Sequence, residues 1–132
     1  MYPIVDANVI LRYLLRDVPD QAESARGPID RGCETTTDIV ADIVYVPSAV
    51  YSVPRKKIFD VLTELLDIIY AEDFPTVVEA LRLFGREKLD FADCLLLARN
   101  RIEGHEIITF DKKLVRLLNK RKTTDAYRLN AG

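Results

Sequence analysis

Hydrophobic and polar positions fall into two kinds of segment along this chain. Short runs of apolar residues at Tyr2–Val5 and within residues 105–110 predict buried strands, because a strand covered on both faces has no polar side. Between these runs, apolar residues recur at helical spacing. The spacing is clearest over residues 58–69, where Asp60 and Glu64 lie on the opposite side of the predicted helix.

Turn-forming and helix-capping residues place the other boundaries. We expect Asp38 to cap a helix over residues 39–51, and we expect Pro47 to kink or split that helix because proline removes a backbone donor. The Gly27-Pro28 pair should make the helix after Asp20 irregular. Further predictions are short strands at 35–37, 70–72 and 126–129, and helices that start near residues 7, 75, 90 and 112.

Strands alternating with helices predict an α/β fold, with a central parallel sheet covered by helices in a three-layer α/β/α arrangement. In such sheets the functional crevice lies beyond the carboxyl ends of the strands. Asp6 and Asp111 follow the two clearest strands directly, so both should lie at that edge. We find no internal repeat or linker and expect residues 1–132 to form a single domain.

Composition narrows the class of protein. The 132 residues are 48% hydrophobic and carry a net charge of -2, which excludes a disordered chain. The apolar runs are too short to cross a bilayer, and Asp6 interrupts any secretory signal, so we expect a cytoplasmic protein without a membrane partner. Cys33 and Cys94 form neither a disulfide framework nor a zinc motif.

Two further acids, Asp42 and Asp93, occur within apolar helical stretches, where a lone buried carboxylate would be costly. If these acids converge with Asp6 and Asp111 within about 5 Å, each pair repels by about 3 kcal/mol at an effective dielectric constant of about 20. A hard cation, Mg²⁺ or Mn²⁺, would relieve that repulsion and serve phosphoryl chemistry. Neither a nucleotide-binding glycine motif nor a catalytic triad is present.

Structural roles compete with these assignments. Asp90 and Asp111 could simply cap helices, and Asn8 could either bond to the backbone or orient Asp6. Seven of the eight charged residues between 112 and 128 are basic, and with Arg55 they could guide a polyanion or could form ordinary solvated helix faces. The candidate RNA contacts are Lys112, Lys113, Arg116 and Arg55.

Five segments, in order, resemble the PIN-domain nucleases, in particular the VapC toxins of prokaryotic toxin-antitoxin pairs. They are IVDANVILRYL at 4–14, DIVADIVYV at 38–46, VPR at 53–55, LDFADCL at 89–95 and ITFD at 108–111. The resemblance implies a PIN-like α/β/α fold with an acidic pocket that binds Mg²⁺ or Mn²⁺ and hydrolyses RNA by a metal-activated water. It further implies a homodimer that a VapB-like antitoxin inhibits.

The resemblance also assigns roles to single residues. Asp6, Asp42, Asp93 and Asp111 match the four acids of the family in that order, as catalytic residues and metal ligands. Asn8, Asp90 and Thr109 match supporting polar positions.

The chain departs from the family pattern at two positions. The second acid is usually Glu, whereas Asp42 is one methylene shorter, and Pro47 follows where the family has an unbroken helix. An alternative function is therefore a catalytically weakened PIN-fold module that binds RNA or an antitoxin. A receiver-like or phosphatase-like domain with the same acidic crevice is a further alternative.

Overall fold

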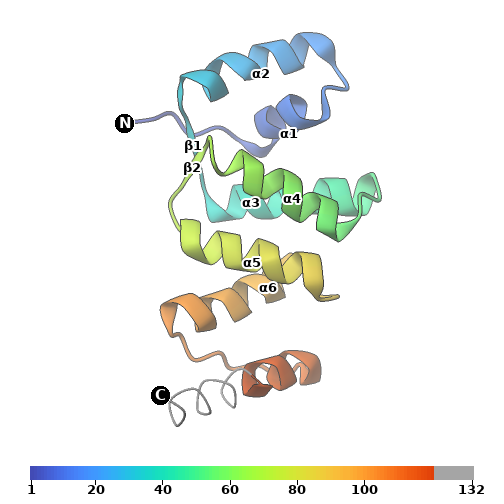
Figure 1. The fold of residues 1–132 in the computed structure, drawn as a ribbon, viewed down its shortest axis with the longest axis vertical. Coiled ribbons are helices and arrows are strands. Elements are labelled where there is room, and N and C mark those ends of the chain that lie inside the picture. Colours follow the sequence, from blue (N-terminus) through green and yellow to red (C-terminus); the bar gives the residue numbers. More distant parts are fainter. Residues whose placement is uncertain (121–132) are drawn as a thin grey trace.

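The computed structural model describes residues 1–120, which form an elongated stack of helices with α1 and α2 at one end (Figure 1). The helices are α1 (Ala7–Leu15), α2 (Pro19–Arg31), α3 (Thr37–Tyr45), α4 (Arg55–Leu65), α5 (Phe74–Arg86), α6 (Phe91–Ala98) and a last helix over residues 112–120. Two π-helical turns, η1 (Val46–Val50) and η2 (Arg99–Glu103), continue α3 and α6.

Residues 1–120 contain one small parallel sheet, which lies at one edge of the helices (Figure 1). Strand β1 (Glu34–Thr35) pairs in parallel with β2 (Tyr70–Ala71), and Ile4 adds a single parallel bridge to Glu34. The parallel direction and the strand near residue 70 were both predicted. Residues 1–120 are nevertheless mostly helical, and the three-layer arrangement is not seen among them. The predicted strand at 126–129 lies outside the described residues.

The strand predicted within residues 105–110 is wrong. This segment has no regular secondary structure, although exposure alternates along it in the manner of a strand. Ile107 and Thr109 are half-buried, whereas Ile108 and Phe110 are 88% and 101% exposed. Strand formation needs backbone partners on a neighbouring strand, and none among residues 1–120 pairs with this segment. The apolar pattern therefore does not place it in the sheet.

Proline affects the helices differently at its two interior positions. The α-helical hydrogen bonds of α3 end at Tyr45, and the chain widens into the π-helical turn η1 around Pro47, as the prediction of a split helix requires. In contrast, α2 continues through Pro28, which lies in its last turn, so the expected irregularity is absent. Thr36, not Asp38, occupies the N-cap position of α3.

One hydrophobic core cluster runs through the described residues and includes side chains from α1 to the helix at 112–120. Its most buried large side chains include Ile10, Ile43, Leu81, Leu97 and Leu114, each at or below 1% exposure. Helix α3 carries Asp42 and packs against both α1 and α6. Asp6 directly precedes α1, and Asp93 lies on α6. None of the helices within residues 1–120 has the length and apolar character needed to span a bilayer.

Arg55 joins the start of α4 to the end of α5. Its guanidinium donates to the carbonyl oxygens of Phe84, Glu87 and Leu89 at 3.2, 3.0 and 2.6 Å, and it lies 4.1 Å from the centre of the Phe84 ring. Carbonyls at the end of a helix lack backbone partners, and a cation there interacts favourably with the helix dipole. Arg55 therefore stabilises the turn between α5 and α6.

We predict that Arg55→Gln lowers the free energy of unfolding by roughly 2 to 3 kcal/mol, because a shorter neutral side chain cannot reach all three carbonyls. Lys56→Gln is the matched control, since Lys56 is exposed on the same helical turn and should change stability by less than about 0.5 kcal/mol. Urea unfolding followed by circular dichroism measures both. Equal stabilities for the two variants would contradict the role given to Arg55.

Candidate functional site

Asp6 and Asp111 each begin a helix. The Asp6 carboxylate accepts a hydrogen bond from the backbone N–H of Val9 at 3.0 Å and caps α1. The Asp111 carboxylate accepts from the N–H of Leu114 at 2.9 Å and caps the helix at 112–120. Each bond uses one carboxylate oxygen and both side chains are exposed, so capping leaves them able to accept another ligand.

The pKa of Asp93 is affected by two other acids, Asp111 and Asp90. It is half-buried in the first turn of α6, and burial, followed by the negative charges of Asp111 and Asp90, raises its pKa above the ordinary value of 3.8. Like charges disfavour ionisation over short distances, so Asp111 and Asp90 lie near enough to Asp93 to act on its charge. Asp90 is one helical turn from Asp93, whereas Asp111 is distant in sequence, and we call these three residues the acidic region.

Asp42 differs from the expectation of a carboxylate surrounded by apolar side chains. It is exposed on α3, whereas Val40, Ile43 and Val44 on the same helix are buried. The helical turn rotates Asp42 toward solvent, where its charge needs no partner. The expectation that burial forces Asp42 to pair is therefore wrong, and within residues 1–120 the Asp42 side chain forms neither a hydrogen bond nor an ion pair.

Carboxylates are chemically suited to a hard cation, but the structure does not arrange these acids as a metal site within residues 1–120. Within residues 1–120, no group of three or more His, Cys, Asp or Glu side chains is placed to hold a metal ion, so the four-acid cluster is not assembled there. Carboxylate oxygens are nevertheless the ligands that Mg²⁺ and Mn²⁺ prefer, and Mg²⁺ often uses only one or two carboxylates together with water and substrate phosphate. Asp93 and Asp111 are two carboxylates whose charges interact.

The supporting polar residues have distinct positions. The Thr109 hydroxyl accepts from the backbone N–H of Asp111 at 3.1 Å, and this bond fixes the turn that presents Asp111. Asp90 occupies the N-cap position of α6 but makes no capping hydrogen bond, so its expected capping role is met in position only. Asn8 is exposed and lines a hollow between α1 and α2 with Arg12 and Ser24.

The four candidate RNA contacts divide into two pairs. Lys112 and Arg116 are exposed on the helix at 112–120. In contrast, Lys113 is half-buried and its ammonium donates to the backbone oxygen of Lys88 at 2.9 Å, while Arg55 is engaged at the end of α5. Sequence reasoning missed this use of Arg55. Its position in the first turn of α4 was an available signal, because a cation there is disfavoured by its own helix dipole.

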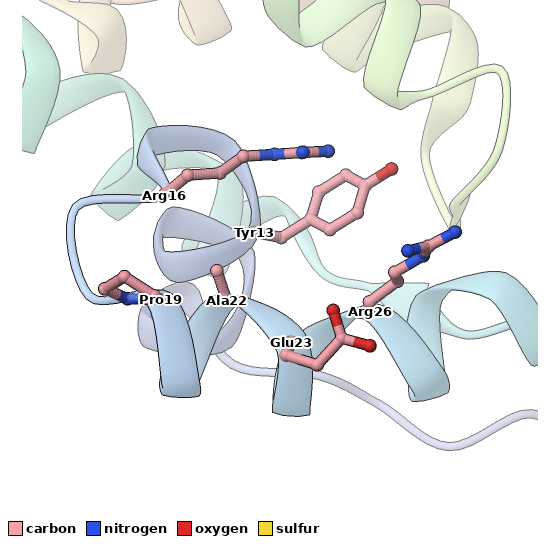
Figure 2. A pocket seen from close by; sticks show the side chains of 6 residues that line it. All are labelled: Tyr13, Arg16, Pro19, Ala22, Glu23 and Arg26. Atoms are coloured by element: carbon pink, nitrogen blue, oxygen red, sulfur yellow. The ribbon is translucent and has the colours of Figure 1, made fainter.

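Sequence reasoning also gave no signal for a hollow between α1 and α2 (Figure 2). The hollow has a volume of about 210 Å³. The guanidinium of Arg16 lies over the Tyr13 ring, 5.8 Å from its centre, and Glu23 and Arg26 line the hollow from α2. It lies at the end of α1 remote from Asp6, and none of Asp90, Asp93 and Asp111 lines it.

We predict that Asp93→Asn leaves the metal-free protein at least as stable as the wild type at neutral pH. Because the folded-state pKa of Asp93 is raised, the folded state binds more protons, and the contribution of Asp93 to stability falls as pH rises from about 3.8 through that pKa. Urea unfolding in a chelator should show the two proteins converging as the pH is lowered. A clear loss of stability in Asp93→Asn at neutral pH would contradict this account of the site.

Comparison with known proteins adds one match. Residues 4–119 match the PIN domain family, a range that includes all four candidate acids and the basic positions Lys112 and Arg116. Searches of curated proteins and of solved structures found no match. PIN domains have an α/β fold and are generally nucleases. Because the match covers most of the 132 residues, this chain belongs to the PIN domain family.

Proposed function

We propose that this chain is a Mg²⁺- or Mn²⁺-dependent endoribonuclease, the toxin component of a VapBC-type toxin-antitoxin system. The observation that best supports the proposal is the electrostatic effect of Asp111 and Asp90 on Asp93, in a chain that belongs to a family of nucleases. Gathered carboxylates that must stay ionised near neutral pH are best stabilised by a divalent cation.

Asp6 and Asp93 would be the direct ligands of the cation, and Asp42 and Asp111 would complete the pocket or position water. When bound, the cation would neutralise the gathered charge and lower the pKa of a bound water. The resulting reaction is hydrolysis of an RNA phosphodiester bond.

Residues around these acids have supporting functions in the proposal. Asp90 raises the pKa of Asp93 and so strengthens the demand for a positive charge beside it. Thr109 fixes the backbone of Asp111 through its hydroxyl. Lys112 and Arg116 attract the RNA backbone, and their exposure is consistent with this role.

The proposed system also requires particular partners. We propose that the chain acts in the cytoplasm as a homodimer, and that a VapB-like antitoxin binds it and blocks the acidic region. These assignments rest on the resemblance of the segments at 4–14, 38–46, 53–55, 89–95 and 108–111 to VapC toxins. Co-expression with the product of an adjacent small gene would test the antitoxin assignment, with a stable inhibited complex as the expected result.

A catalytically weakened PIN-fold module that binds RNA or an antitoxin is the second candidate. The exposed position of Asp42 on α3 and the lack of a three-acid group within residues 1–120 favour it. The family match gives no support to a receiver-like or phosphatase-like domain. The two remaining candidates differ in a single measurable property, which is the rate of RNA cleavage.

We predict that the chain cleaves RNA in Mn²⁺ or Mg²⁺ and that a chelator abolishes the cleavage. Asp93→Asn should lower the rate by at least about 100-fold, which corresponds to roughly 2.7 kcal/mol of transition-state stabilisation. Asp60→Asn, an exposed acid on α4, is the control and should cleave at the wild-type rate. Cleavage that survives in Asp93→Asn, or in the chelator, would indicate a different mechanism or a contaminating nuclease.

We also predict a pH profile that depends on Asp90. Metal binding needs an ionised Asp93, so activity should fall as the pH is lowered through the raised pKa of that residue, above the range of an ordinary aspartate. Asp90→Asn removes one of the charges that raise this pKa and should shift the acidic limb to lower pH. The same limb in Asp90→Asn and wild type, measured at a fixed Mn²⁺ concentration, would show that Asp93 does not control the profile.

A further inference from the structure

Phe110 has an unusual position for a large apolar residue. Phe110 is 101% exposed. It precedes Asp111, the residue that caps the helix at 112–120. Exposing an aromatic side chain to water forfeits the stabilisation that burial would provide, roughly 1.5 to 3 kcal/mol. Because the fold makes no use of this ring within residues 1–120, a role in binding is the simplest explanation for its exposure.

A row of basic side chains begins next to Phe110. Lys112, Arg116 and Lys120 follow one another at intervals of four residues, so they lie on one side of the helix with successive members about 6 Å apart. All three are exposed, whereas Leu114, Leu117 and Leu118 on the other side are buried in the core. We call these three exposed residues the basic row. Because the leucines are packed in the core, the basic row faces solvent.

Phe110 and the basic row share one surface. They line a common hollow of about 660 Å³, together with Val115 and Asn119. Within residues 1–120 neither Lys112 nor Arg116 forms an ion pair, so their charges are available to an anion. No acidic side chain lines this hollow among the described residues.

We propose that this hollow is a docking track for single-stranded RNA, in which a base stacks on Phe110 while Lys112 and Arg116 bind the following phosphates. The inference deepens the proposed ribonuclease function, on which it rests for the fate of the bound strand. Proteins that bind single strands combine a positive groove with exposed aromatic rings, because stacking requires unpaired bases. A duplex would offer its phosphates to the basic row but no base face to Phe110.

The position of Phe110 in the sequence gives the track a register. Asp111, the next residue, is one of the acids that act on Asp93. A base held on Phe110 would therefore fix its neighbouring phosphodiester close to Asp111 and Asp93. Lys113 is not part of this track, since it does not line the hollow and its ammonium donates to the backbone oxygen of Lys88.

A second copy of the chain is the other occupant that could cover Phe110. The charge of the surface argues against it, because a two-fold contact would bring the basic row of one copy against that of the other. Like charges facing one another across an interface weaken association. RNA has the opposite charge and supplies the base that the aromatic ring can bind.

The test measures binding without cleavage. The full chain is titrated in a chelator with a fluorescently labelled 12-nucleotide single-stranded RNA, and with the same sequence as a duplex, and binding is followed by anisotropy. Phe110→Leu should weaken single-strand binding by about 5- to 100-fold and leave duplex binding unchanged, and Phe110→Trp should restore it. The double variant Lys112→Gln, Arg116→Gln should flatten the slope of log affinity against log salt by about 1.4. Lys56→Gln should bind as the wild type does.

Each outcome bears on one proposal only. Unchanged single-strand binding in Phe110→Leu would overturn the docking track, while the cleavage assay with Asp93→Asn would still decide the ribonuclease function. Conversely, the expected binding without any metal-dependent cleavage would retain the track and reject the enzyme. Analytical ultracentrifugation of the same variants covers the remaining occupant: a wild-type oligomer that Phe110→Leu dissociates, with RNA binding intact, would overturn the track in favour of self-association.

Discussion

Repulsion among carboxylates is the constraint on which the rest of this account depends. Asp93 is half-buried, and the charges of Asp111 and Asp90 add to the cost of ionising it. A folded protein can meet that cost by protonation or by a counter-charge. In the proposed function a divalent cation would supply this counter-charge at the place where a phosphodiester must be bound.

Helix packing creates this repulsion. Asp93 lies on α6 and Asp111 caps the following helix, whose leucines are part of the same core as α6. The Asp111 carboxylate also accepts a hydrogen bond from the N–H of Leu114. The residue that raises the pKa of Asp93 therefore stabilises the helix at 112–120 as its cap. Arg55 acts from the other side, since it holds the turn that leads from α5 into α6. The acidic region therefore depends on contacts that carry no catalytic chemistry.

Much of the helical structure and part of the sheet could be predicted from periodicity and turn residues, whereas the arrangement of the site could not. The π-helical turn at Pro47 and the strand at Tyr70–Ala71 follow from local chemistry. The segment at 105–110 shows the limit: its exposure alternates as a strand's would, yet pairing depends on a partner elsewhere in the chain. Asp42 shows another limit, because neighbours in sequence do not determine which side of a helix faces solvent until the helix is packed. The capping role of Asp111 could be predicted from its position before a helix, but the capping role of Asp6 was not predicted, and the interaction of Asp93 with Asp111 depends on the fold.

Calorimetric titration with Mn²⁺ tests the central claim most directly, because it measures cation capture without any RNA. The account predicts one Mn²⁺ site per chain that is lost in Asp93→Asn and weakened in Asp111→Asn, a substitution that keeps a good capping residue and so leaves the helix intact. Heat of binding that is absent in the wild type, or unchanged in Asp93→Asn, would contradict the claim that these carboxylates hold a divalent cation.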